Sequence, residues 1–169
     1  MKATEVLADA FGRIREVVHD VVEGLSAEEL NARVDPKANS ITWLVWHLTR
    51  VQDDHVADAS GREQVWTAQD WFSRFALPVP AEATGFGQTA AQVGKIVVES
   101  GELLLGYYDA VHEQSTAFIR GLAAADLERV VDERWDPPVT LGVRLVSVIA
   151  DDLQHAGQAA YVRGVLQRR

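Results

Sequence analysis

Residues 40–61, SITWLVWHLTRVQDDHVADASG, indicate most clearly which kind of fold this chain adopts. Ser40 is a residue type that commonly begins a helix, and Gly61 is one that commonly follows the end of a helix. At about 100° per residue, apolar side chains such as Leu44 and Val51 fall on the same face. The stretch therefore predicts one long helix with its apolar face turned toward a core.

Three further segments, 3–23, 101–120 and 140–165, show the same helical periodicity. The connections contain shorter helical patterns, at 25–30, 89–99 and 126–128. No segment shows the alternation of apolar and polar residues that is typical of a strand. We therefore predict an all-α fold, a four-helix bundle with short extra helices in the connections, formed by one domain over residues 1–169.

Composition excludes several classes of protein. The 169 residues are 47% hydrophobic and 24% charged, which is typical of a globular domain. The chain has no cysteine, so disulfides, thiolate zinc sites, iron–sulfur clusters and a cysteine nucleophile are excluded, and a reducing cytoplasm is compatible with the sequence. The net charge of −9, without a basic stripe, argues against nucleic acid as a partner. We expect no membrane span and no secretory signal.

Residues 62–88 form a long connection that is rich in aromatic and turn-forming residues. It contains Trp66, Trp71, Phe72 and Phe75, followed by the glycine-rich stretch 85–87. A connection of this length and aromatic content indicates an ordered, functional loop. The same aromatic residues could instead serve only to pack the core.

The chain has five histidines, and two of them lie on apolar surfaces of long predicted helices. These two are His47 and His155, whereas His19 lies on a charged helix face and is expected to be exposed to solvent. His112 is interpreted as structural or exposed. His47 and His155 are therefore the candidates for chemistry in the bundle interior.

Carboxylates precede His155 at helical spacing. Asp151 is four residues before it and Asp152 three, so either acid can share a helix face with the imidazole. Two imidazoles and one carboxylate from facing helices form a donor set for a divalent cation that keeps open positions for water or substrate. From spacing alone, a histidine–aspartate pair buried in the core is the more common explanation of the pattern.

Three stretches taken together resemble the DinB/YfiT-like superfamily: WLVWHL at 43–48, GFGQT at 85–89 and DDLQHAGQ at 151–158. The resemblance extends over essentially the whole chain. It implies an up-down-down-up four-helix bundle, a homodimer, and a divalent metal held by His47, Asp151 and His155. Zinc is the default metal, with nickel or iron as alternatives.

The resemblance also implies an activity. Several members of the superfamily are S-transferases that use low-molecular thiols such as mycothiol, bacillithiol or glutathione. We therefore expect a metal-dependent transferase that activates such a thiol for attack on an electrophilic small molecule. Asp151 departs from the commonest pattern, in which a histidine stands there, but mycothiol-dependent maleylpyruvate isomerases have a carboxylate at that position. Those isomerases carry a further C-terminal domain, so isomerisation itself is not expected here.

Other interpretations remain open at this stage. A non-catalytic metal-binding protein of the stress response would need the same donors, and a non-haem iron oxygenase uses two histidines and one carboxylate. A di-iron carboxylate bundle fits less well, because it needs glutamates that the core positions lack. His55 and Gln158 are weaker candidates near the site, and Asp54 is a candidate hydrogen-bond partner for His47.

Overall fold

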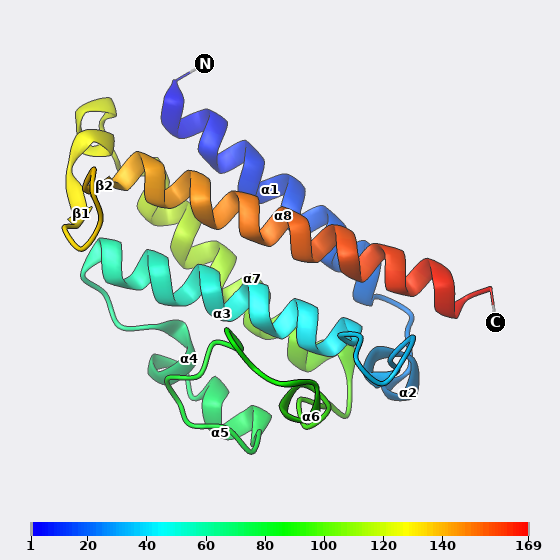
Figure 1. Ribbon diagram of the computed structural model, residues 1–169. Helices are drawn as coiled ribbons and strands as arrows, with labels where there is room; N and C mark the ends of the chain where they lie inside the picture. Colours follow the sequence, from blue (N-terminus) through cyan, green and yellow to red (C-terminus); the bar gives the residue numbers. More distant parts are fainter. Residues whose placement is uncertain (1, 169) are drawn as a thin grey trace.

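The computed structural model describes residues 2–168 and contains the predicted bundle. The long helices in this part of the chain are α1 (Ala3–Val22), α3 (Ile41–Ser60), α7 (Gly101–Arg120) and α8 (Leu141–Leu166). In Figure 1, α1 and α8 run in one direction while α3 and α7 run in the other. The predicted all-α class and the up-down-down-up order are therefore confirmed.

The long helices begin and end where side-chain chemistry favours it. The Ser40 hydroxyl accepts a hydrogen bond from the backbone N–H of Trp43 at the start of α3, and Thr140 does the same for Val143 at the start of α8. Gly61 follows α3 in the left-handed conformation, at φ 66°. These caps satisfy backbone groups that a helix end leaves unpaired, so the helix limits follow closely from the sequence.

Each long helix packs against two of the others. α3 packs against α7 and α8, and α1 packs against the same two helices from the opposite side of the bundle. The core is formed by apolar side chains that are almost fully buried, among them Phe11, Ile14, Val18, Leu44, Trp46, Leu48, Tyr108, Val111, Leu145 and Val148. The interface between α3 and α8 is the place where side chains from residues 41–60 and 141–166 can meet.

The connections contain more structure than the sequence predicted. Their helices are α2 (Ala27–Asn31), α4 (Val65–Ala68), α5 (Trp71–Phe75), α6 (Ala90–Val93) and the 3-10 helix η1 (Ala124–Glu128). Neither α4 nor α5 was predicted, since a helix of four or five residues is too short to show periodicity. The segment predicted as 89–99 is helical only over Ala90–Val93 and ends at Gly94.

The aromatic residues of α4 and α5 pack on α7. The rings of Trp66, Trp71 and Phe75 lie 4.9, 5.8 and 5.8 Å from the Tyr107 ring, measured between centroids. Most of the aromatic residues in 62–88 therefore pack in the core, which is the second of the two interpretations given for this connection.

The expectation that the chain has no strand is wrong. β1 (Val130–Asp132) pairs antiparallel with β2 (Val139–Thr140) in a small hairpin before α8. Strands of two and three residues are too short for an alternating pattern to be recognised. The hairpin is held to α8 by Asp132, whose carboxylate accepts hydrogen bonds from Arg134 and Arg144 at 2.9 Å.

A buried arginine fixes the loop that crosses α3 between α5 and α6. Arg50 is fully buried and donates to the backbone carbonyls of Ala81 and Ala83 at 3.3 and 3.1 Å. Its guanidinium lies 3.6 Å from the Asp53 carboxylate, which also accepts a hydrogen bond from the Tyr107 hydroxyl. Since Arg50 is charged and every contact is inside the protein, this network holds residues 81–84 in one position on α3.

No helix in the described part of the chain is long and apolar enough to cross a membrane.

Candidate metal centre

His47 lies on the inner side of α3, with 5% of its surface exposed. Its Nδ1 is 2.5 Å from the backbone carbonyl oxygen of Thr84. A carbonyl can only accept, so Nδ1 carries the proton and the lone pair is on Nε2. Burial, with the nearby His155, lowers the pKa of His47 despite the Thr84 contact, so the ring is neutral at pH 7. A neutral imidazole with an available Nε2 is the form that binds a metal.

His155 and Asp151 occupy consecutive turns of α8 on the side that faces α3. The His155 Nδ1 is 2.9 Å from the Gln158 side-chain oxygen, so this ring also has its proton on Nδ1. Its Nε2 lies 3.7 Å from Asp151 Oδ1. Both histidines therefore present the same nitrogen, Nε2, while a carbonyl-type oxygen holds the other.

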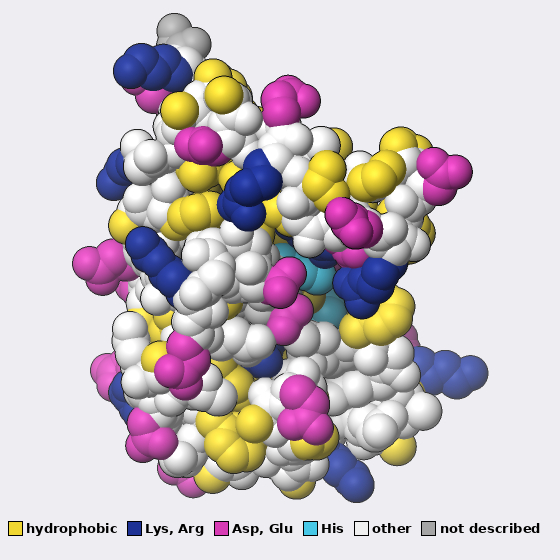
Figure 2. Space-filling view, turned by 90° about the vertical axis from the view of Figure 1, so that its left-hand side faces the viewer, with side chains coloured by type: hydrophobic (Ala, Val, Ile, Leu, Met, Phe, Trp, Pro, Cys, Tyr) yellow, Lys and Arg dark blue, Asp and Glu magenta, His cyan; other side chains and the backbone are white. Residues whose placement is uncertain are grey.

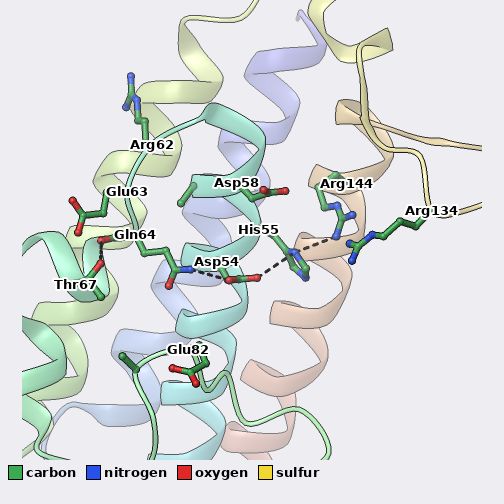
Figure 3. Close-up of a pocket in the computed structure, with 12 residues that line it drawn as sticks. Asp54, His55, Asp58, Arg62, Glu63, Gln64, Thr67, Glu82, Arg134 and Arg144 are labelled. Carbon is green, nitrogen blue, oxygen red and sulfur yellow. Dashed lines mark hydrogen bonds and ion pairs between the residues drawn. The ribbon is translucent and has the colours of Figure 1, made fainter.

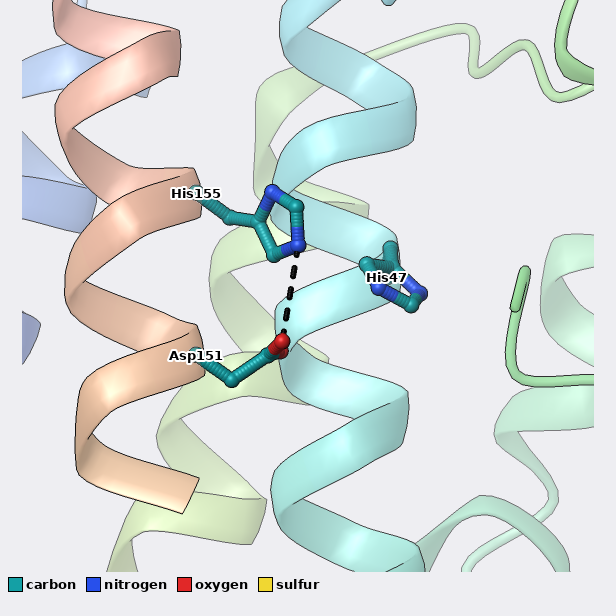
Figure 4. Close-up of side chains that lie close together, drawn as sticks. All are labelled: His47, Asp151 and His155. Atoms are coloured by element: carbon teal, nitrogen blue, oxygen red, sulfur yellow. Dashed lines mark ion pairs between the residues drawn. The ribbon is translucent and has the colours of Figure 1, made fainter. Parts of the chain in front are cut away.

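The three predicted residues come together in the structure (Figure 4). One donor atom from each of His47, Asp151 and His155 lies within 4.8 Å of the other two. The second oxygen of Asp151, Oδ2, is buried and has no hydrogen-bond partner among the described residues. A buried carboxylate oxygen without a partner is costly, and a cation would remove that cost. The donors, their protonation and the unpartnered oxygen all fit a divalent cation.

The loop over the site depends on a glycine. Gly85 has φ +96°, a backbone conformation that residues with a side chain rarely adopt. A Cβ at this position would lie 2.9 Å from His47 Nδ1 and 3.0 Å from the Trp46 ring. The absence of a side chain thus allows the Thr84 carbonyl to reach His47. Trp43 also contacts His47, because the two rings stack with 4.6 Å between their centroids.

A cavity of about 460 Å³ opens beside the three residues. His47 and Asp151 line it, and Val51, Phe86 and Val148 give it a largely apolar wall. We call it the apolar cavity. Phe86 is 92% exposed, although it is a large apolar side chain next to the site. Figure 2 shows histidine side chains recessed in a hollow between acidic and basic side chains on this face.

Asp152 does not join this site. Its carboxyl group is fully buried in the bundle, has no hydrogen-bond partner among the described residues, and has a pKa raised well above its usual range by burial and then by Asp151. The two adjacent aspartates thus face different environments. Asp151 is the one that shares the site with the histidines.

The weaker candidates have different roles. Asp54 accepts a hydrogen bond from Gln64 at 2.8 Å and is not the partner of His47. His55 accepts at Nδ1 from Arg144 at 3.1 Å. Gln158 is the partner of His155, which was one of the roles considered for it.

The remaining histidines lie elsewhere in the bundle. The expectation that His19 is simply exposed to solvent is wrong, since its two ring nitrogens contact Glu23 and Asp109 at 2.8 and 2.9 Å. Sequence spacing could not reveal this contact, because Asp109 is on α7 and ninety residues away. His112 is partly buried, and its Nδ1 has no partner within residues 2–168.

Sequence reasoning missed the residues that hold the site in place. The Thr84 carbonyl is a backbone group, and Arg50 was not recognised as the residue that fixes the loop carrying it. The glycine-rich stretch at 85–87 was recognised as part of the long connection and of the resemblance, but not as the place where the loop approaches His47. A positive charge in the middle of an otherwise apolar helix face is the signal that could have identified Arg50.

Comparisons with known proteins found a matching family and a similar structure. A family model described as mycothiol S-transferase matches residues 6–167. The fold is similar to the crystal structure of a conserved protein from Enterococcus faecalis, with a TM-score of 0.93 and 31% sequence identity. That match covers 100% of this chain and 99% of the other. Among curated proteins, none matches the sequence.

Proposed function

The chain belongs to the mycothiol S-transferase family, within the DinB/YfiT-like group, and on this basis we propose that it transfers a low-molecular thiol to an electrophilic small molecule with a divalent cation as cofactor. The resemblance found in the sequence is thereby confirmed at the level of the family. The metal, the thiol and the electrophile are parts of the proposal.

His47, Asp151 and His155 would hold the cation. Two neutral imidazoles and one carboxylate neutralise only one of its two positive charges, so the site favours an anionic further ligand. When bound, the cation supplies the charge that keeps a thiol in its reactive thiolate form at neutral pH. We propose zinc, because two nitrogens and one oxygen with an open position are a donor set common at catalytic zinc.

The protein residues position the two substrates. Thr84 and Gln158 keep both imidazoles in the protonation state that exposes Nε2. The apolar cavity beside these donors suits the electrophile, because Val51, Phe86 and Val148 can exclude water from the attacking sulfur. Since the chain has no cysteine, the sulfur nucleophile must come from a substrate.

The observation that carries this proposal is the convergence of three donor atoms within 4.8 Å of one another, two of them from residues that line a cavity. The test is conjugation of a bimane electrophile by metal-loaded protein with mycothiol, bacillithiol or glutathione. We expect turnover with at least mycothiol and its loss after chelation. A metal-loaded protein that conjugates none of the three thiols would contradict the proposal, and cobalt substitution without sulfur charge-transfer bands would indicate a metal site that binds no thiol.

We also propose a homodimer. Val143, Val146, Leu153 and Tyr161 are 45–69% exposed and recur at helical spacing along α8. An exposed apolar stripe of this length is typical of an interaction surface. Light scattering should give twice the mass of the chain, and Val146→Glu should give the mass of one. The reducing cytoplasm, where low-molecular thiols stay reduced, is the compartment we propose.

A further inference from the structure

His55 lies where two cavities meet. It lines the apolar cavity together with Val51 and Val148, and it also lines a larger cavity of about 670 Å³ that contains many charged side chains (Figure 3). His55 is eight residues after His47 on α3, which is about 12 Å along the helix axis. Because both histidines line the apolar cavity, this cavity extends over two turns of α3. A ligand that fills it therefore contacts His55 as well as His47.

The protonation of His55 is fixed by Arg144. The Arg144 guanidinium lies 3.1 Å from His55 Nδ1, as Figure 3 shows. A guanidinium can only donate, so Nδ1 accepts and the ring proton is on Nε2. Burial and then the charge of Arg144 lower the pKa of His55 despite the nearby Asp54, so the ring is neutral at pH 7. His55 therefore presents an N–H donor at Nε2, whereas His47 and His155 present a lone pair at that atom.

The Nε2–H of His55 has no hydrogen-bond partner among residues 2–168. Other polar side chains of the apolar cavity offer no donor of this kind. The carboxylates of Asp54 and Asp151 only accept, and the Ser147 hydroxyl already donates to a backbone carbonyl of α8 at 2.9 Å. The Thr84 hydroxyl can rotate, so the direction of its proton is not fixed. His55 therefore provides a donor of fixed direction that a ligand can use.

The charges around this imidazole oppose one another. Arg134 and Arg144 share one carboxylate, that of Asp132, at 2.9 Å each, so these three side chains keep one positive charge. The Asp54 carboxylate, 3.7 Å from the imidazole, and Asp58 in the larger cavity add negative charge nearby. An ionised group on a ligand therefore gains little here. An uncharged oxygen is the acceptor that suits a neutral N–H in these surroundings.

We propose that His55 determines which electrophile is bound: its Nε2–H donates to an uncharged carbonyl oxygen at the end of the electrophile away from the carbon that the sulfur attacks. The inference rests on the proposed function, which places the electrophile in the apolar cavity. The body of the electrophile contacts Val51, Phe86 and Val148. The thiolate sulfur forms the new bond to carbon and the leaving group departs with the bonding electrons, so His55 binds the substrate without exchanging a proton. The substrate class is an apolar electrophile with a remote ketone, ester or amide oxygen.

The first test uses unreactive ligands, so it does not depend on conjugation. NMR titration measures binding of acetophenone and ethylbenzene to metal-loaded and to chelated protein. Benzoate is added after chelation only, because a carboxylate also binds a cation. We expect acetophenone to bind about fivefold more tightly than ethylbenzene, the effect of one hydrogen bond, and more tightly than benzoate. His55→Phe should remove the preference for acetophenone, and His55→Gln, whose amide keeps an N–H, should retain it.

His112→Phe is the matched control, because it removes a partly buried histidine that lines neither cavity. It should keep the preference for acetophenone. Equal binding of acetophenone and ethylbenzene by the unaltered protein, binding of neither, or a preference that persists in His55→Phe would overturn the inference. A preference that is lost in His55→Gln as well would assign His55 a structural role instead. Tighter binding of benzoate than of acetophenone would overturn the assignment to an uncharged oxygen.

Kinetics with mycothiol and metal-loaded protein separate this inference from the proposed function. The electrophiles are para-acetylbenzyl bromide and para-ethylbenzyl bromide, which share the reacting carbon and differ only at the far end. His55→Phe should raise KM for the acetyl compound about fivefold and leave KM for the ethyl compound, kcat and metal content unchanged. Conjugation with equal effects on both compounds would overturn the inference and leave the transferase standing. A preference for acetophenone in a protein that conjugates no thiol would refute the transferase and leave the oxygen-binding site standing.

Discussion

Two clusters of histidine and carboxylate side chains connect long helices in the described part of this bundle, and the one between α3 and α8 has the properties of a metal site. Between α1 and α7, both ring nitrogens of His19 contact carboxylates, from Glu23 and Asp109, and Asp109 also binds Arg15. Between α3 and α8, the Nδ1 of each histidine is held by a carbonyl-type oxygen, and the Nε2 has no hydrogen-bond partner among the described residues. The residue types are the same, but the polar groups of the first cluster are satisfied by one another, whereas the second cluster has possible metal-ligand atoms that no protein group occupies.

This difference shows that composition alone does not identify a site. The α1–α7 cluster neutralises its own charges and needs no ligand. The α3–α8 cluster has an unpartnered buried oxygen on Asp151 and a cavity at its open side. Possible metal-ligand atoms that have no protein partner and lie next to a cavity are the feature that indicates a functional site.

The largest expected effect comes from releasing the loop that carries Thr84. Arg50→Ala removes a fully buried guanidinium and leaves Asp53 buried without its charge partner, which should lower the free energy of unfolding by about 3–5 kcal/mol. Urea denaturation measures this. Arg15→Ala, which breaks a half-exposed ion pair in the other cluster, should cost less than about 1 kcal/mol. Equal losses for the two variants would contradict the role given to Arg50.

A smaller but local effect is expected from Gly85→Ala. The added Cβ meets the His47 ring at 2.9 Å and the backbone is at φ +96°, so the strain should be about 2 kcal/mol. We expect weaker metal binding as well, because the Thr84 carbonyl must move. Competition with a chromophoric chelator measures the affinity, and Gly157→Ala, which has open space at its Cβ, is the control. Unchanged affinity in Gly85→Ala would show that the loop does not position His47.

Gln158→Leu should weaken the α3–α8 site without touching a proposed ligand. It removes the acceptor for the His155 Nδ1 proton, a change that typically lowers metal affinity about tenfold. The free energy of unfolding of the metal-free protein should stay nearly constant, since the side chain is exposed. The same chelator competition applies. Wild-type affinity in this variant would argue that the orientation of His155 is fixed by something other than Gln158.

The smallest effect concerns the α1–α7 cluster and depends on pH. Partial burial lowers the pKa of His19, but hydrogen bonds to Asp109 and Glu23 outweigh it and raise the pKa above its usual value. The charged form is therefore favoured by folding, and its contribution is full below about pH 6.5 and is lost as the pH rises through the raised pKa. His19→Gln should lower the free energy of unfolding by up to about 1 kcal/mol at pH 6, and the loss should be smaller at pH 9. A loss that grows with pH would contradict this assignment.

The fold could be predicted from sequence because its signals are local. Helix caps at Ser40 and Thr140 and the apolar periodicity between them act within a few residues. The short helices α4 and α5 and the hairpin could not be predicted, because contacts with Tyr107 and Arg144 from elsewhere in the chain stabilise them. Local patterns contain no information about such contacts.

The candidate site, too, could be predicted from the sequence only in part. The spacing of Asp151 and His155 is local, and the resemblance selected Asp151 from two adjacent acids. The buried position of Asp152 gives the physical reason for that choice. The contact of the Thr84 carbonyl with His47 depends on how the loop after α5 crosses α3, which only the three-dimensional structure shows.

The central claim is that His47, Asp151 and His155 hold one cation, and metal content tests it most directly. Elemental analysis is made on the unaltered protein, on His155→Ala, and on His19→Ala as the matched histidine variant from the α1–α7 cluster. We predict stoichiometric divalent metal in the unaltered protein and in His19→Ala, and its loss in His155→Ala. Equal metal in the unaltered protein and in folded His155→Ala would contradict the claim.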